Sequence, residues 1–580
     1  MPASRRDFLF RAAVLGLAGT TRPELLSAAP SAGPGGATPT GATATAPAPT
    51  DTEITVEMIE AAEKIFGVTQ TPEQREAMLE DLQERLEVLE SLHAASPPNH
   101  LIPAWRFDPQ IAGDRPRPRV PRRPWEPQLA PMPQSDEDLA FAPVTTLSGL
   151  LKQRDVRSLD LTQLYLERLK RLDPQLHCVI NLTEERALAQ ARAADAELDA
   201  GLWRGPLHGV PWGAKDLLSV RGYPTTWGAM PFKDQVIDRN ATVVERLDAA
   251  GAVLVAKLTT GALAWGDVWF GEKTRNPWNL DQGSSGSSAG PGSAVAAGLV
   301  GFAIGSETLG SIVSPSTRNG VTGLRPTFGR VSRHGAMTLC WSMDKLGPMC
   351  RSAADCALVF QAIQGTDHRD PTTVDGDFSW PPAVQPSRVR LGYVADAFEG
   401  EFRGAEADRA VLQVLRSLGF DPKPMAWPDR STAPAMLTLS VETAAAFDEL
   451  SRTGGTDSMV SQQLWPENFR QSRFISGVDF LNGQRQRTLL MQDVSALMQD
   501  FDVIVTNHRR GGLAITNLTG HPSVTVPNRF SPLEDAPDSP RRQPDAINFI
   551  GALYQDDMAL AVAHAYQSAT DFHLQRPPIV

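Results

Sequence analysis

The chain has 580 residues, 41% of them hydrophobic, and a formal net charge of −12 at pH 7. Since a single core usually stops growing at roughly 250–300 residues, this length predicts two domains or one large domain with additions. The acidic balance argues against nucleic acid as a partner, because phosphate contacts need clustered Lys and Arg.

The chain opens with the pattern of an export signal. Residues 4–10 read SRRDFLF, and a short apolar run follows at 12–18, which is typical of a twin-arginine signal. That run is too short to span a bilayer as a helix. We expect residues 1–28 to be a signal peptide that the twin-arginine (Tat) export machinery recognises. The protein would then be periplasmic or secreted, with no stable membrane anchor after cleavage. The alternative is a basic, disordered start.

A low-complexity linker and a helical extension follow the signal. Residues 29–50 are rich in Ala, Gly, Pro and Thr and cannot form a core. Within 51–127 we expect two helices and a Pro/Arg connector. The second helix opens at Thr71 with a capping pattern. An apolar face then follows, which we expect to pack on this protein rather than on a partner: Met78, Leu82, Leu86, Leu89 and either Leu92 or His93.

The main domain is expected over 140–575. Residues 145–174 and 184–201 have helical spacing, and four apolar runs read as strands, at 251–258, 302–306, 389–394 and 501–507. Strands that alternate with longer helices predict the α/β class, with a large central mixed β-sheet flanked by helices on both faces. The four cysteines lack zinc-like spacing, so we expect free, buried thiols, and nothing in the sequence implies a metal or organic cofactor. It does not indicate an oligomeric state.

Residues 283–311 place Gly and Ser on both sides of an apolar run. A phosphate-binding loop would need a Lys directly after its last Gly, and none is present. The remaining interpretation is a serine nucleophile. Ser311 follows a predicted buried strand, where free backbone N–H groups can form an oxyanion hole.

A serine nucleophile needs a base. The histidines form no recognisable triad motif, and His208, the best placed, reads as structural. Lys215 ends an apolar, strand-like run, and burial would lower its pKa until the neutral amine could accept a proton. A buried Lys215–Asp216 ion pair explains the same residues equally well.

Several segments, in the same order, resemble the amidase signature family over roughly residues 140–570. They are GPLHGVPWGAKD (205–216), NPWN (276–279), SGSSAGPGSAVAAG (285–298), GSETLGSIVSP (305–315), GVTGLRPTFGRVSRHG (320–335), SMDKLGP (342–348) and NLTGHPSVTVP (517–527). The resemblance implies the amidase signature fold and a Ser–cis-Ser–Lys site.

Carried onto this chain, the resemblance makes Ser311 the nucleophile, Ser287 the bridging serine and Lys215 the base. Ser288 would support the hydrogen-bond chain, and the cis peptide bond would join Gly286 to Ser287. Backbone N–H groups would form the oxyanion hole, from Thr308, Leu309, Gly310 and Ser311.

Five residues depart from the family pattern. Leu309 stands where the family has Gly, Val313 where it has Arg and Glu307 where it has Asp. Ala289 and Pro291 replace small residues after the serine pair. These changes bear on the supporting residues and on substrate size. One or two tryptophans are expected to line an apolar acyl pocket, from the set Trp212, Trp227, Trp265, Trp269 and Trp341.

The function these features imply is hydrolysis of a carboxamide, in a small-molecule or peptide-like substrate, to an acid and ammonia or an amine through an acyl-enzyme. Two alternatives stay open. One is the glutaminase subunit of a tRNA-dependent amidotransferase, against which the export signal argues. The other is a secreted binding protein on an inert amidase scaffold.

Overall fold

The computed structural model describes residues 53–95, 97–111, 125–127, 131–382, 384–462, 464–507 and 512–579. The predicted signal peptide and linker, and most of the Pro/Arg connector, lie outside these ranges. None of the described helices is long and apolar enough to cross a membrane.

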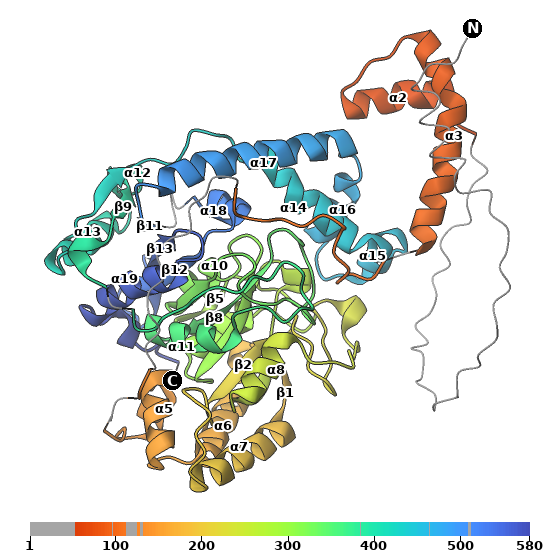
Figure 1. The fold of residues 1–580 in the computed structure, drawn as a ribbon. Coiled ribbons are helices and arrows are strands. Elements are labelled where there is room, and N and C mark those ends of the chain that lie inside the picture. Colours follow the sequence, from red (N-terminus) through yellow and green to blue (C-terminus); the bar gives the residue numbers. More distant parts are fainter. Residues whose placement is uncertain are drawn as a thin grey trace, which may run out of the picture. The chain divides into compact units, whose positions relative to one another are not determined.

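The central feature is an eleven-stranded mixed sheet within the described residues, in the order β1-β3-β2-β6-β8-β7-β12-β13-β11-β9-β10 (Figure 1). The strands are β1 (Val179–Leu182), β2 (Pro211–Lys215), β3 (Val253–Leu258), β6 (Phe302–Glu307), β7 (Thr322–Arg325), β8 (Lys345–Cys350), β9 (Leu391–Val394), β10 (Lys423–Met425), β11 (Val503–Asn507), β12 (Ser523–Pro532) and β13 (Arg542–Gly551). All four predicted strands are present. A separate pair is formed by β4 (Arg275–Asn276) and β5 (Asn279–Gly283).

Three parallel strands toward the β1 end of the sheet position the candidate site. Strand β2 runs parallel to both β3 and β6, so the carboxyl ends of these three strands lie at the same edge. All residues of β2, β3 and β6 are buried, as expected for strands covered on both faces.

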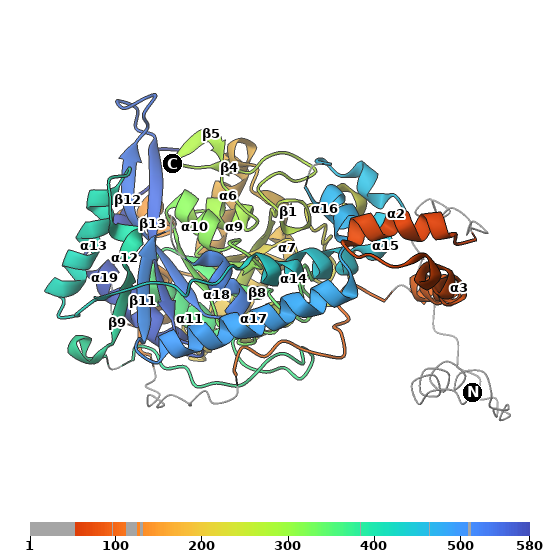
Figure 2. The ribbon, with the colours of Figure 1, turned by 90° about the horizontal axis from the view of Figure 1, so that it is seen from above.

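Helices cover the two faces of this part of the sheet. Alternate side chains of β3 and β6 enter two separate apolar clusters, Val253 and Ala303 in one and Leu254 and Phe302 in the other. The helices are α4 (Asp136–Ala140), α5 (Val144–Gln153), α6 (Ser158–Leu176), α7 (Glu184–Asp199), α8 (Thr242–Ala249), α9 (Ala289–Ala296), α10 (Val313–Asn319), α11 (Ala353–Ile363), α12 (Ala395–Phe398), α13 (Ala405–Ser417), α14 (Ala433–Ala446), α15 (Asp448–Arg452), α16 (Trp465–Ser472), α17 (Gly477–Met498), α18 (Leu513–Thr519) and α19 (Asp556–Ser568). Helix α17 runs beside α14 (Figure 2).

The extension forms two helices, α2 (Val56–Phe66) and α3 (Pro72–Ala95). Thr71 and Gln74 make the predicted reciprocal cap, since the backbone N–H of each donates to the other's side chain, at 2.7 and 3.3 Å. The two helices contact each other, and an Arg75–Glu63 ion pair of 2.8 Å joins them. The predicted apolar face is not buried as a whole. Met78, Leu82 and Leu86 are half-buried, whereas Leu89 and Leu92 are 45% and 55% exposed.

Candidate active site

Ser311 lies in the loop between β6 and α10, where the strand ends at the shared edge of the sheet. The residue is 9% exposed. Gly310 before it has φ 87°, a left-handed conformation that favours glycine. The N–H groups of Leu309, Gly310 and Ser311 have no hydrogen-bond partner among the described residues, so they are able to donate to a ligand.

The Glu307 side chain holds the loop between β6 and α10 in place. Its carboxylate accepts the N–H groups of Ile312 at 2.8 Å and Val313 at 2.9 Å. Arg325 and Asn517 donate to its other oxygen, each at 2.9 Å. Burial opposes the charge, but Arg325 and these donors outweigh it and lower the pKa of Glu307 to about 2. The residue at the family's Asp position therefore supports the nucleophile segment directly.

Lys215, the last residue of β2, points at a cluster of serine hydroxyls. Its Nζ lies 2.7 Å from Ser287 Oγ, 3.2 Å from Ser288 Oγ and 2.8 Å from Ser306 Oγ. The chain thus brings together the lysine and both predicted serines. Ser306 was not predicted as a site residue. Its position in a strand parallel to β2 is the signal that could have found it.

Lys215 does not pair with the neighbouring Asp216. That carboxylate lies 2.6 Å from Lys257 Nζ on β3. Lys215 is fully buried, and this burial lowers its pKa well below the ordinary value, against a smaller opposing effect of Asp344 and Glu307. The ion-pair interpretation of Lys215 is therefore wrong, and the lysine has the environment of a neutral amine.

The bridging segment has the expected backbone. The Gly286–Ser287 peptide bond is cis. A side chain at Gly286 is excluded, since a Cβ there would lie 1.7 Å from the carbonyl oxygen of Gly266. The Ser288 N–H donates to the Ser311 carbonyl oxygen at 3.2 Å, which ties the two serine segments together. Ser311 Oγ has no hydrogen-bond partner within the described ranges. Catalytic hydrogen bonds without a bound ligand are often long and shorten in the complex.

Ser311 opens into a cavity of about 470 Å³ whose wall combines polar and apolar groups. The wall includes Trp265, Leu309, Leu339, Leu439 and Trp465. The two tryptophan rings meet edge to face at 4.4 Å. Of the five tryptophans considered from the sequence, Trp265 alone lines this cavity; Trp465, which the sequence did not single out, lines it too.

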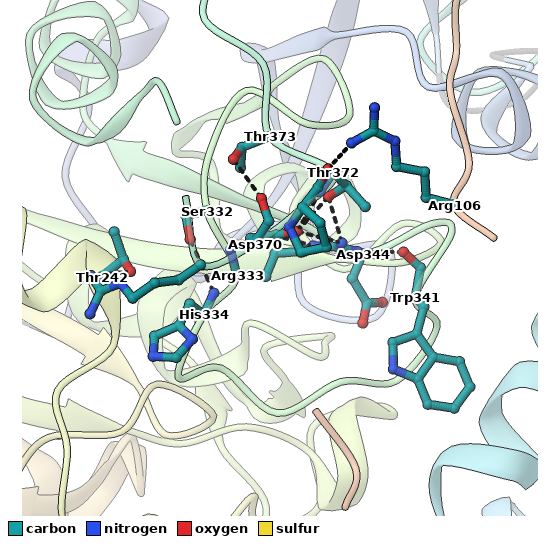
Figure 3. A network of polar contacts seen from close by, with 12 residues as sticks. Arg106, Thr242, Ser332, Arg333, His334, Trp341, Asp344, Asp370, Thr372 and Thr373 are labelled. Atoms are coloured by element: carbon teal, nitrogen blue, oxygen red, sulfur yellow. Dashed lines mark hydrogen bonds and ion pairs between the residues drawn. The ribbon is translucent and has the colours of Figure 1, made fainter. Parts of the chain in front are cut away.

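A second polar network holds the cavity wall. Asp344 accepts the Thr308 hydroxyl at 2.6 Å and the N–H of Leu339 at 2.8 Å, so one carboxyl links the oxyanion loop to the wall. Figure 3 shows Asp344 beside Arg333, which donates to Asp370 at 2.9 Å and to the Trp341 carbonyl at 2.5 Å. These bonds fix the segment that carries Leu339.

Two further expectations concern residues outside the cavity. The four cysteines are free and buried, as predicted. His208 lies away from the serines. Its Nδ1 accepts the Arg204 N–H at 3.2 Å and its Nε2 lies 3.0 Å from the Glu197 carboxylate, as expected for the predicted structural role. No group of three His, Cys, Asp or Glu in the described chain could hold a metal ion.

The fold and this serine–lysine cluster define an amide-hydrolysing enzyme of the α/β class. The model of the amidase family matches residues 160–508, and the chain belongs to this family. It is 33% identical over 488 residues to the A subunit of the glutamyl-tRNA(Gln) amidotransferase of Methylococcus capsulatus, an alignment that covers 74% of this chain and 97% of that relative.

Solved structures agree on the fold. The peptide amidase of Stenotrophomonas maltophilia superposes with a TM-score of 0.66 at 28% identity and covers 75% of this chain and 98% of its own. A 6-aminohexanoate cyclic dimer hydrolase superposes with a TM-score of 0.65 at 23% identity over 76% of this chain and 99% of its own. The protein is thus an amidase that acts on carbon–nitrogen bonds, with the amidase signature fold.

Proposed function

We propose that the protein hydrolyses a carboxamide through an acyl-enzyme on Ser311, with Ser287 and Lys215 as a proton relay. The observation that carries this proposal is the 2.7 Å contact between Lys215 Nζ and Ser287 Oγ inside a fully buried cluster. A lysine that is neutral at working pH can accept a proton, and hydroxyls are the only side-chain groups it contacts among the described residues.

The relay runs from the nucleophile to the amine. Lys215 accepts the Ser287 proton while Ser287 accepts the proton of Ser311, after the Ser311 side chain has turned toward it. Ser311 attacks the amide carbon, and the free N–H groups of the loop stabilise the oxyanion; one such donor is typically worth about 2.7–4 kcal/mol of the barrier.

The second half reverses the proton path. The protonated lysine returns its proton through Ser287 to the departing nitrogen, and the C–N bond breaks. Water then attacks the ester on Ser311, giving its proton to the relay, and the carboxylic acid leaves. Ser288 and Ser306 keep the lysine in line, and each step balances without a metal or organic cofactor.

The test is amide turnover by the mature enzyme on a panel of carboxamides, with ammonia or amine release as the readout. We expect turnover without tRNA or a second protein, and loss of turnover in Ser311→Ala with unchanged melting temperature. Turnover that survives in folded Ser311→Ala would overturn the assignment of the nucleophile.

A second candidate function is favoured by one observation. Relatives about 30% identical over nearly their whole length are the A subunits of glutamyl-tRNA(Gln) amidotransferases. In that role, amide hydrolysis would depend on partner subunits and tRNA. Ammonia release by the isolated chain separates the two functions.

A third candidate is an inert binding protein on this scaffold, which Leu309 and Val313 at the family's Gly and Arg positions favour. It predicts that Ser311 stays unreactive toward a fluorophosphonate although the protein is folded. The Lys215 cluster argues against this candidate. A buried amine beside three hydroxyls lowers stability, and an inert protein would have no catalytic role to offset that cost.

We also propose export by the twin-arginine route, supported by the SRRDFLF segment at residues 4–10. The full chain, expressed in a bacterium with this pathway, should appear in the periplasm or medium shortened by its signal peptide. Changing both Arg5 and Arg6 to Lys should leave it inside the cell. Export of that variant at the wild-type level would contradict the proposal.

A further inference from the structure

A second cavity of about 510 Å³ lies beside the one that holds Ser311. Its walls come from helix α10, helix α18 and the paired strands β12 and β13, which Figure 2 shows as long neighbours. Two residues line both cavities, Ser285 and Arg318. Ser285 directly precedes the Gly286–Ser287 bond, and Arg318 lies on the helix that begins two residues after Ser311. A substrate held at Ser311 can therefore extend past Arg318 into the second cavity.

The wall of the second cavity is rich in arginine. Four arginines and one acidic residue line it: Arg318, Arg325, Arg403, Arg529 and Asp545. Three of the arginines have carboxylate partners, since Arg325 pairs with Glu307, Arg403 with Glu534 and Arg529 with Asp545.

Arg318 is the exception. Its guanidinium contacts the neutral side-chain amide of Gln282 at 3.2 Å, and no carboxylate pairs with it in the part of the chain that the structure describes. It is partly buried at the junction of the two cavities. The forked N–H donors of a guanidinium at this junction can bind both oxygens of a carboxylate.

The first cavity has a different lining. Two tryptophans and three leucines give it apolar surface, and its charged residues are Arg318, at the junction, and Asp267, which accepts the Ser285 N–H at 2.9 Å. An apolar acyl group can pack against the tryptophans and leucines, while Arg318 is left to bind an anion on the other side.

We propose that the substrate is an N-acyl amino acid or a similar amide, with an apolar acyl group against Trp265 and Trp465 and a carboxylate on the amine side bound by Arg318. This inference rests on the proposed function of Ser311. Hydrolysis adds the hydroxyl of water to the acyl carbon and the proton to nitrogen, which releases an apolar carboxylic acid and a free amino acid.

A matched pair of substrates tests the proposal. N-phenylacetylglycine carries the carboxylate, and N-phenylacetylethanolamine carries a hydroxyl in its place. We expect the wild-type enzyme to hydrolyse N-phenylacetylglycine with a kcat/KM at least about 10-fold higher than that for N-phenylacetylethanolamine. Arg318→Gln should lower kcat/KM for the glycine amide about 10- to 100-fold, the usual cost of losing a charge-assisted contact, and change it less than about 3-fold for the ethanolamine amide.

Three controls accompany the pair. Arg416→Gln, at an exposed position on α13 that lines neither cavity, should change neither rate. Arg318→Lys keeps the charge and should retain an intermediate preference, which covers the case in which the Gln variant does not fold. Melting curves verify folding of each variant.

Equal rates on the two amides, or an equal loss on both in Arg318→Gln, would overturn the inference. Faster hydrolysis of N-benzylsuccinamic acid, whose carboxylate is on the acyl side, than of N-phenylacetylglycine would overturn the assignment of the carboxylate to the amine side. If neither amide is hydrolysed while Ser311 is still labelled by a fluorophosphonate, the substrate class is wrong and the proposed function stands. Without labelling, both fail.

Discussion

Two lysines are buried on neighbouring parallel strands, and their surroundings differ. Lys257 on β3 contacts the Asp216 carboxylate at 2.6 Å, the Pro224 carbonyl at 2.7 Å and the Thr225 hydroxyl at 2.6 Å. Lys215 on β2 contacts three serine hydroxyls and no carboxylate within the described residues. Both side chains have lost their water.

The period of the strands explains which lysine receives the carboxylate. Ala214 is the cross-strand partner of Lys257, and successive side chains on a strand point to opposite faces. Lys215 therefore points away from the face of Lys257, toward the serines, while Asp216 follows in the turn after β2, where its carboxylate reaches Lys257.

The comparison separates burial from pairing. Burial lowers the pKa of both lysines. For Lys257 the contacting carboxylate of Asp216 counteracts this effect. Lys215 contacts hydroxyls instead, and only the charges of Asp344 and Glu307, which it does not contact, oppose the effect there. Desolvation without a contacting counter-charge is what prepares an amine to act as a base.

The largest expected effect is on catalysis. Lys215→Met should lower kcat/KM about 10²- to 10⁴-fold, the range of a general base. The melting temperature should not fall, because the variant removes a desolvated amine. Amide turnover and melting curves measured together test this. A variant that loses stability and keeps its activity would reverse the roles of the two lysines.

The matched change at the other lysine should act on stability. Lys257→Met leaves Asp216 buried without its partner and should lower the free energy of unfolding by about 3–5 kcal/mol. The folded fraction should still react at Ser311. Adding Asp216→Asn should recover part of the loss, as denaturant titration would show; no recovery would mean that the ion pair is not the source of the effect.

Ser306→Ala should have a smaller effect. It removes one of the three hydroxyls that hold Lys215, a hydrogen bond worth about 0.5–1.5 kcal/mol, so kcat should fall about 2- to 12-fold while KM changes little. Ser306→Thr keeps the hydroxyl and should recover activity. An unchanged pH profile and rate in the Ala variant would show that Ser306 does not position the lysine.

The smallest effect concerns the pH dependence of stability. Lys215 has a lowered pKa in the folded chain, so the unfolded chain binds more protons between that pKa and the ordinary value near 10.5. Stability therefore rises with pH across this window. Lys215→Met should flatten this rise relative to wild type, as unfolding titrations at several pH values would show; an unchanged slope would contradict the shift.

The fold was largely predictable, because the strands at 251–258 and 302–306 are continuous apolar runs. Ser311 and Lys215 were candidates from the pattern around them, but the choice of Lys215 as base and the roles of Ser287 and Ser288 came from the family resemblance. Ser306 and Trp465 were missed because their contacts come from chain folding across 91 and 202 residues, to Lys215 and Leu263, a distance that local pattern does not report. The choice between Asp216 and the serines as partners of Lys215 needed the register of β2 and β3.

The measurement that tests the central claim most directly is the rate of fluorophosphonate labelling at Ser311 as a function of pH, mapped by peptide mass spectrometry. The account predicts a rate that rises with pH and levels off below the ordinary lysine pKa, with Lys257→Met following the same curve and Lys215→Met losing the fast labelling at every pH. Equal labelling of wild type and folded Lys215→Met would contradict the assignment of Lys215 as the base.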